Sequence, residues 1–499
     1  MVRPASPDPG QPQSLAAAAM REGTFHLGNS FRFQEPRGAF CHSGWCQQCK
    51  VRLSDCRVGL ACELAPDVLA LLIPPSRAKA ILGKAARLML RPWFHEGVVP
   101  KLAVLQSLFL GIVRRSSGAL PISTIIPVAG GKWQHESCKT LIIGGGPAGL
   151  AAAEAMSPDD DVLVVERNPG GDGQNRVTGF RVLRGTALGL YPDKNAPSGF
   201  HLLCGTPLSP VRIAFRKLIV ASGVYERILF VKGSTLPGVI SLSAFEQLLS
   251  QQALPATSKV VVFAPKPQLS RALKMADEHG VRVDCVIGDI SERSSTRVVR
   301  SAYPVRMRGR KRLSAVELSD GSTVICDVFV VGFVQPSYEF QMQAGRQVSQ
   351  RGPGYPLETG GGASFPLLVV GSAAGHSGID AATRHASDAV HAWLRGDEPM
   401  REAAAVPMPS PDQVADDVVL CPCEDVLVGD VRAACRDGFD YIENVKRRTG
   451  AGTGPCQGKL CHALLVQTVV EAGGTAAIPT VRPLARPQSL ASFAGPISD

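Results

Sequence analysis

A glycine-rich turn between an apolar strand and a helix of small residues constrains the fold of this chain more than any other feature. Gly144, Gly146 and Gly149 follow the buried-type strand Thr140–Ile143 in G-x-G-x-x-G spacing, and the next apolar strand ends at Glu166. The glycines permit a tight turn and a close approach of backbone N–H groups to a pyrophosphate, while an acid at this distance accepts ribose hydroxyls. This combination predicts a dinucleotide-binding βαβ unit. The alternative is a glycine-rich turn that binds no nucleotide.

Further apolar runs, with helical patterns between them, predict a doubly wound α/β core of one or two sheets. We expect strands at Lys217–Ala221, Lys259–Phe263, Arg282–Ile287, Thr323–Gly332 and Leu367–Val370. A stretch rich in Pro, Ala and Asp at 396–416 is typical of a linker. Beyond it, Gly438 and Gly450 are placed as helix stops in a small helical unit.

The composition sets further limits. A chain of 499 residues exceeds what one hydrophobic core usually holds, so we expect more than one domain. No apolar run reaches the roughly 18–20 residues of a membrane helix, and the N-terminus lacks the pattern of a secretory signal. The net charge of +10 is a weak argument for an acidic partner. We therefore expect a cytoplasmic protein that neither spans a membrane nor binds nucleic acid.

Four cysteines near the start have the spacing C-x4-C-x2-C-x12-C: Cys41, Cys46, Cys49 and Cys62. Three thiolates from one loop and a fourth from later in the chain match the plant-type arrangement around a [2Fe–2S] cluster. Zinc is the competing ligand, but its sites usually contain two C-x2-C pairs, and only one is present. Unligated thiols are the remaining alternative.

Four cysteines near the end have the spacing C-x-C-x32-C-x4-C: Cys421, Cys423, Cys456 and Cys461. Four thiolates suit [2Fe–2S] or zinc, and the spacing does not choose between them. A disulfide or an empty site is the alternative. Clustered thiols in a chain of this size favour a metal or redox cofactor over a disulfide framework.

Other features are weaker. Four alternating arginines predict a solvated hairpin, with an acidic partner as the alternative: Arg306, Arg308, Arg310 and Arg312. His376 lies on a glycine-rich turn, where it would contact a flavin or cap a helix. His42 and His462 adjoin the clustered cysteines, and we interpret them as neighbours of the ligands or as exposed. The chain contains no G-x-S-x-G, HExxH or P-loop motif, so nothing predicts a hydrolase.

Four ordered segments resemble one known family. They are PRGAFCHSGWCQQCKV, IIGGGPAGLAAA with VVERNPGGDGQ, IVASGVYERILFVKGSTLPGVI, and CPCEDV followed by VKRRTGAGTGPCQGKLC. In this order they are similar to the α subunits of multi-subunit flavin-dependent amine and amino-acid dehydrogenases. That group includes heterotetrameric sarcosine oxidase, dye-linked L-proline dehydrogenase, opine and hydroxyproline dehydrogenases and bacterial hydrogen cyanide synthase. The likeness covers about residues 14–490.

The resemblance implies an α/β fold in which a two-dinucleotide-binding-domain flavoprotein core lies between two [2Fe–2S] modules. A truncated plant-type ferredoxin-like module is expected at 14–70 and a connecting segment at 71–135. The FAD/NAD(P)-type core is expected at 136–395, with a degenerate second nucleotide fold at about 256–335. After the linker at 396–416, we expect a helical [2Fe–2S] module similar to bacterioferritin-associated ferredoxin at 417–475, and a tail at 476–499.

The resemblance also implies cofactors and partners. FAD, or another adenine nucleotide, would contact Gly144, Gly146, Gly149, Glu166, Gln174, Ser222, Gly223, Gly371, Ser372 and His376. One or both cysteine sets would hold [2Fe–2S] clusters, and FMN would lie at an interface between subunits. Amine oxidation would occur on a separate catalytic β subunit of the D-amino-acid-oxidase type, with a small third subunit beside it. Electrons would pass to an external acceptor, which would keep the chain in the cytoplasm or at the inner membrane surface.

Departures from the family pattern affect the nucleotide sites and the first module. Pro265, Lys266 and Pro267 replace a glycine-rich turn in the second nucleotide fold and remove backbone donors, which argues against NAD there. Ser372 stands where the family has Asp in G-D-x-x-G, which leaves FAD against another adenine nucleotide open. The stretch after Gln174 is short. The first ferredoxin hairpin is missing, so we expect that module to rely on a partner for cover.

The favoured hypothesis is an electron-transfer subunit of a flavin-dependent amine or amino-acid dehydrogenase or oxidase. A self-contained NAD(P)H-dependent ferredoxin or acceptor reductase is the first alternative. The second is a degenerate flavoprotein that serves as a scaffold, with structural metal in the cysteine sites. Iron, sulfide and flavin content would separate the three.

Overall fold

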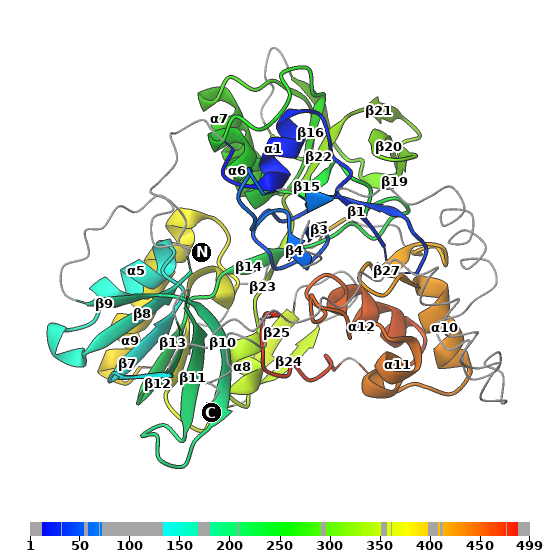
Figure 1. Cartoon of the computed structure of the whole chain (residues 1–499). Helices are drawn as coiled ribbons and strands as arrows, with labels where there is room; N and C mark the ends of the chain where they lie inside the picture. Colours follow the sequence, from blue (N-terminus) through cyan, green and yellow to red (C-terminus); the bar gives the residue numbers. More distant parts are fainter. Residues whose placement is uncertain are drawn as a thin grey trace, which may run out of the picture.

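The computed structural model describes residues 12–30, 32–53, 58–68, 70–71, 133–167, 180–206, 209–290, 296–350, 357–360, 362–397, 408–409, 413–475 and 477–487. Most of the expected connecting segment and linker, and all of Gln174, lie outside these residues. Figure 1 shows two α/β units, with the N-terminal module (blue) between the second unit (green) and the C-terminal module (orange and red).

The first α/β unit is built on a five-stranded parallel sheet of order β26-β13-β7-β8-β9. Its strands are Leu367–Val369, Lys217–Val220, Thr140–Ile143, Val162–Glu166 and Arg181–Arg184. Alternate residues face opposite layers: Ile142 packs with helices α5 (Pro147–Glu154) and α9 (Ile379–Arg395), whereas Leu141 packs toward a second sheet. That second sheet has the order β10-β11-β12-β6, with strands Thr186–Pro192, Phe200–Gly205, Pro210–Ala214 and Gln134–Ser137.

The second α/β unit repeats this design. Its parallel sheet has the order β15-β22-β16-β17-β18, with strands Val239–Ser241, Val328–Val331, Val260–Phe263, Val283–Ile287 and Arg297–Val299. Helices α6 (Leu242–Ser250) and α7 (Lys266–Glu278) cover one face. The other face carries the antiparallel sheet of β19 (Pro304–Gly309), β20 (Leu313–Leu318) and β21 (Thr323–Ile325). Two crossing segments, β14 (Val224–Glu226) and β23 (Val334–Pro336), pair antiparallel between the units.

The expectation of one strand over Thr323–Gly332 is wrong. The run divides into β21 and β22, which belong to different sheets. Asp327 stands between them, and its carboxylate accepts hydrogen bonds from the Lys259 backbone N–H at 3.2 Å and from Arg312 at 2.7 Å. These bonds stabilise a turn that apolar periodicity alone does not reveal.

Short elements form the two terminal modules. The N-terminal one contains α1 (Leu15–Arg21), β1 (Gly28–Asn29), β2 (Pro36–Arg37), β3 (Lys50–Leu53), β4 (Val58–Leu60) and β5 (Ala70–Leu71). The C-terminal one contains β27 (Val419–Cys421), β28 (Val426–Leu427), α10 (Val428–Arg436), α11 (Ile442–Thr449) and α12 (His462–Glu471). Helix α8 (Glu339–Gln343) and the pair β24 (Gln347–Gln350) and β25 (Leu357–Gly360) lie beside α12 in Figure 1. Gly438 and Gly450 have positive φ just after α10 and α11, as the sequence predicts for helix stops.

One hydrophobic core crosses the module boundaries. It contains Trp45 of the N-terminal module, Phe263 of the second α/β unit and Leu464 of the C-terminal module. The predicted fold class, an α/β flavoprotein-type core with an N-terminal ferredoxin-like module and a C-terminal helical module, is confirmed by this arrangement. No helix among the described residues is long and apolar enough to cross a membrane.

Candidate functional site

The glycines of the first turn each have a distinct structural reason. Gly144 has φ +105°, and a side chain there would collide with the Ala221 carbonyl oxygen. A side chain at Gly149 would collide with the Gly144 carbonyl oxygen, so glycine permits the close packing of α5 on the turn. Gly146 caps the N-terminus of α5, and a Cβ there would meet no atom within 4 Å. The open space faces free helix N–H groups, which is the environment that a pyrophosphate requires.

Glu166 ends β8 beside this turn. Its carboxylate accepts a hydrogen bond from the Gly145 backbone N–H at 2.7 Å, which fixes the carboxylate at the edge of the turn. A carboxylate has further acceptor sites after one such bond. Its predicted bond to a ribose therefore stays a prediction that the observed contact permits.

A second glycine-rich turn approaches from the other side. The 3₁₀ turn Gly371–Ala374 contains Ser372, and its Gly371 N–H donates to His385 Nδ1 at 3.1 Å. A side chain on Gly371 would collide with Ala148 of α5, so the turn lies directly against that helix. His376 stacks on His385 with ring centroids 3.8 Å apart. It does not cap α9, because the N-cap of that helix is Gly378.

A cleft of about 270 Å³ opens between the two α/β units, where these turns meet. Its lining includes Gly146, Gly223, Glu226, Gln268, Ser372 and His376. Gln268 Nε2 donates to Ser377 Oγ at 2.6 Å and so connects α7 to the turn before α9. Ser222 stands just behind the cleft, where its hydroxyl lies 2.6 Å from that of Ser337. Burial raises the pKa of Glu226 above its ordinary value, and its Oε1 accepts from Ser243 N at 3.0 Å.

The four N-terminal cysteines face one another. All are buried. Burial would raise the pKa of Cys41, but hydrogen bonds from the thiols of Cys46 and Cys62 and from two backbone N–H groups outweigh it and hold that pKa well below its ordinary value. The backbone donors are Ser43 N at 3.5 Å and Cys46 N at 3.4 Å. The Cys62 thiol also bonds to Cys49. Buried sulfurs that accept backbone N–H bonds fit thiolate ligands of an iron–sulfur cluster.

The four C-terminal cysteines meet in two crossed pairs. The thiol of Cys423 hydrogen-bonds to Cys456, and that of Cys461 to Cys421. The bond from Cys423 lowers the pKa of Cys456 to about 7, and backbone N–H groups of Leu460 and Gly458 lower it further. A side chain at Gly454 would collide with Cys423, so this glycine lets the second pair reach the first. Two pairs of sulfurs fit a cluster in which each iron takes two protein thiolates.

No group of three or more His, Cys, Asp or Glu side chains is placed to hold a single metal ion among the described residues. The scattered cysteines that the structure describes are free thiols outside both sets. Burial raises the pKa of Cys138, Cys204 and Cys326 to about 12 and that of Cys285 to about 11. Such thiols are inert neighbours in the core.

The two cysteine sets lie against each other. Gln48, between Cys46 and Cys49, directs its side-chain amide to the Cys423 sulfur at 3.4 Å and to the Cys46 carbonyl oxygen at 3.1 Å. Asp425, two residues after Cys423, is fully buried. It accepts from Arg37 at 2.8 Å and from the Phe33 backbone N–H at 2.9 Å.

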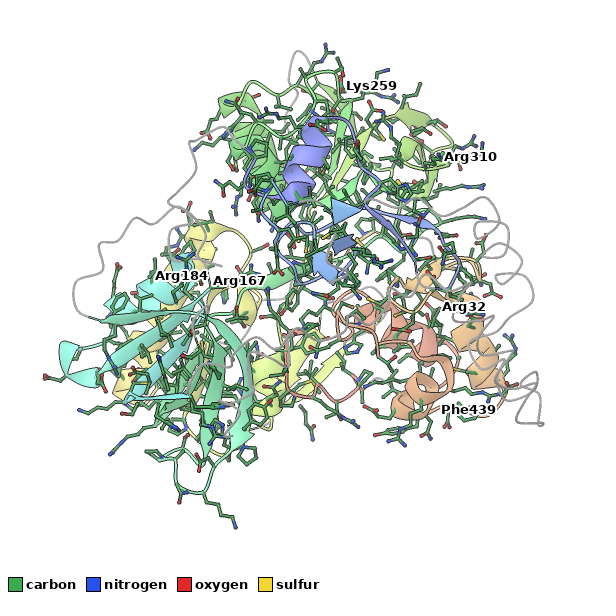
Figure 2. The ribbon with its side chains drawn as sticks, in the orientation of Figure 1. Arg32, Arg167, Arg184, Lys259, Arg310 and Phe439 are labelled. Atoms are coloured by element: carbon green, nitrogen blue, oxygen red, sulfur yellow. The ribbon has the colours of Figure 1, made fainter. Side chains whose placement is uncertain are left out.

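Arginines link the N-terminal cysteine loop to the first nucleotide unit. Arg167, directly after Glu166, donates to the Ser43 carbonyl oxygen at 2.5 Å, and Arg486 donates to the same oxygen at 3.1 Å. Burial, and then the nearby charge of Arg486, lower the pKa of Arg167. Figure 2 shows Arg167 at the edge of the first unit that faces the N-terminal module, and Arg32 beside the C-terminal module.

A buried polar network fills the space between the cleft and the C-terminal cysteines. Glu339 and Lys459 form an ion pair at 3.3 Å, with each side chain 2% exposed. Tyr225, next to Glu226, packs its ring 5.0 Å from that of Trp45 in the cysteine loop. Burial, and then the charge of Glu339, raise the pKa of Tyr225 well above its ordinary value. The network therefore joins the cleft wall to both modules.

The expectation that His42 and His462 are exposed is wrong, since both are buried. Burial, and then the charge of Lys446, lower the pKa of His462 to about 3, and its Nδ1 lies 2.7 Å from the Tyr338 hydroxyl. Burial lowers the pKa of His42 to about 4. The expected arginine hairpin is observed, and its arginines are exposed: Arg306 and Arg308 lie on β19, and Arg308 pairs with Glu317.

Several residues at the centre were not predicted from the sequence: Gln48, Arg167, Tyr225, Glu339, Asp425 and Lys459. Each makes its decisive contact with a residue far away in the chain. The only local signal is their position within the cysteine motifs and beside the expected nucleotide residues.

Comparisons with known proteins agree with the modular fold. A family model described as a 2Fe-2S iron-sulfur cluster binding domain matches residues 10–66, and one described as the sarcosine oxidase A3 domain matches residues 419–496. A solved structure of L-proline dehydrogenase from P. horikoshii has a TM-score of 0.66 at 15% identity. The match covers 97% of this chain and 94% of that one, so the two share a fold over nearly their full lengths.

Two curated relatives extend the likeness in sequence. The alpha subunit of sarcosine oxidase from Rhizobium meliloti is 24% identical over 97% of this chain and 56% of its own length, so the chain spans about half of that relative. An opine oxidase subunit of the same organism is 24% identical over 71% of this chain and 98% of its own length. From these relatives and the shared modular architecture, we conclude that the chain belongs to the family of α subunits represented by those of sarcosine oxidase and opine oxidase.

Proposed function

We propose that this chain is the electron-transfer subunit of a hetero-oligomeric, flavin-dependent amine or amino-acid dehydrogenase or oxidase. The observation that carries the proposal is the position of both four-cysteine sets in one continuous core, with the nucleotide cleft joined to them through Tyr225 and Trp45. The names of the relatives, sarcosine oxidase and opine oxidase subunits, support a substrate with a C–N bond.

The nucleotide cleft would hold FAD or a related adenine nucleotide. Gly146 and the N-terminus of α5 would contact its phosphates, and Glu166 would accept a ribose hydroxyl. Ser372 would donate one hydrogen bond, without the negative charge that Asp brings at this position in the family. A bound flavin would supply the ability to take up electrons in pairs and release them singly. The residues of this chain would bind it, orient it and exclude water from it.

The two cysteine sets would each hold a [2Fe–2S] cluster. Cys41, Cys46, Cys49 and Cys62 would be the ligands of the first, and Cys421, Cys423, Cys456 and Cys461 those of the second. The backbone N–H groups on Cys41 and Cys456 would stabilise the negative charge of these ligands. Oxidation of the amine would take place on a catalytic β subunit, with FMN at the interface and an external acceptor receiving the electrons.

Co-expression of the chain with a candidate β subunit tests this proposal. The purified complex should oxidise an amine or imino acid and reduce an added dye, whereas the chain alone should give little turnover. Amine oxidation by the chain alone would contradict a separate catalytic subunit. Reduction of the chain by NADH or NADPH would instead support a self-contained reductase, and cysteine sites that hold redox-silent zinc would support a scaffold.

A further inference from the structure

The side chain of Gln48 is the direct contact between the two cysteine sets. Its Nε2 atom lies 3.4 Å from the Cys423 sulfur and 3.1 Å from the Cys46 carbonyl oxygen. A primary amide carries two N–H donors, so both acceptors can be satisfied at once. Cys46 belongs to the N-terminal set and Cys423 to the C-terminal set. The amide therefore completes an unbroken path of covalent and hydrogen bonds from one candidate ligand to the other.

The surrounding contacts hold this amide in place. The buried carboxylate of Asp425 binds Arg37 and the backbone of Arg32 and Phe33, so the two modules are fixed together two residues beyond Cys423. Buried charge pairs with good geometry tolerate little displacement, because each separated charge would be left without a partner in a dry environment. Gln48 thus faces Cys423 across a rigid junction.

We propose that Gln48 is the positioning residue that couples the two centres, an inference that rests on the proposed function because it requires a cluster in each cysteine set. A hydrogen bond to a ligand sulfur stabilises the extra negative charge of a reduced cluster and raises its reduction potential. The Gln48 amide thus favours electron uptake at the C-terminal centre. In the transfer, the electron lost by the N-terminal centre is the electron gained by the C-terminal one. No bond forms or breaks, and no proton moves.

Two substitutions separate this role from a structural one. Gln48→Leu removes the donor at similar volume, and Gln48→Glu replaces the donating group with an oxygen that bears negative charge. As a matched control, Gln467→Leu removes an amide of the same size in the C-terminal module, where Nε2 bonds only to Glu471 at 2.9 Å. The chain, co-purified with its partner, is titrated with dithionite under anaerobic conditions, and the midpoint potential of each centre is followed by electron paramagnetic resonance.

We expect Gln48→Leu to lower the midpoint potential of the C-terminal centre, and Gln48→Glu to lower it further, while the N-terminal centre and Gln467→Leu stay at the parent values. The magnetic interaction between the two reduced centres should weaken in both Gln48 variants. Unchanged potentials in both Gln48 variants, in a parent that shows two centres, would overturn this inference alone. A parent with fewer than two centres would overturn the proposed function and this inference together.

Discussion

The guanidinium of Arg37 and the carboxylate of Asp425 form an ion pair at 2.8 Å, with 4% and 0% of their side chains exposed. The two residues come from opposite ends of the chain. Asp425 also accepts from the backbone N–H groups of Arg32 and Phe33, so one carboxylate joins the N-terminal module to the C-terminal one. The docking of the two cysteine sets depends on this residue.

Asp425→Asn should therefore destabilise the protein strongly. Breaking a buried pair leaves Arg37 uncompensated and costs about 3–5 kcal/mol. The exposed pair of Asp416 and Arg432, at 2.7 Å, offers the control, since Asp416→Asn should cost at most about 1 kcal/mol. Denaturant unfolding of the three proteins measures both effects. Equal losses in the two variants would show that Asp425 has no special role at the junction.

The nucleotide turn yields a pair of contrasting glycine variants. Gly146→Val should fold normally, because its φ of −72° suits any residue and its Cβ meets no atom, but the side chain would enter the cleft and reduce bound nucleotide. Gly144→Ala should destabilise the protein, because it combines φ +105° with a collision against Ala221. Melting temperature and nucleotide content after purification distinguish them. Full nucleotide retention by Gly146→Val would exclude this turn as the binding site.

The cysteine sets can be tested separately. Cys423→Ala should remove about half of the iron and sulfide, since one of two four-cysteine clusters would be lost. Cys435→Ala is the control in the same module, because its half-buried thiol lies outside both sets. Iron and sulfide analysis of anaerobically purified protein gives the answer. Unaltered iron in the Cys423 variant would remove the C-terminal set from consideration as a cluster site.

Glu226 predicts a dependence of stability on pH. Burial raises its pKa above the ordinary value, so the folded state holds this proton more tightly than the unfolded state does. The resulting stabilisation is present below the unfolded pKa of about 4.5 and is lost as pH rises through the raised folded pKa. Glu226→Gln keeps an acceptor for Ser243 and has no charge to bury. Its free energy of unfolding should thus exceed that of the parent at pH 8, with the difference shrinking at pH 4.5. A variant less stable than the parent at pH 8 would contradict this role of Glu226.

The sequence predicts those parts of the molecule whose structure is determined locally. The turn at Gly144–Gly149 and strands β7, β8, β16 and β17 follow from periodicity and glycine spacing within a few residues. The bridge from Gln48 to Cys423 spans 375 positions and the pair of Arg37 and Asp425 spans 388, so no local pattern specifies either. The buried state of His462 is likewise set by packing against Gly452, Gly458 and Tyr338. The cysteine spacings are informative because ligand chemistry, rather than propensity, fixes them.

The most direct test of the electron-transfer function is the metal and chromophore content of the anaerobically purified chain. We predict a flavin or related nucleotide and about four irons per chain with equal sulfide, two irons for each set of four cysteines, and visible bands that dithionite bleaches. A colourless chain that contains zinc and no flavin would contradict the electron-transfer function.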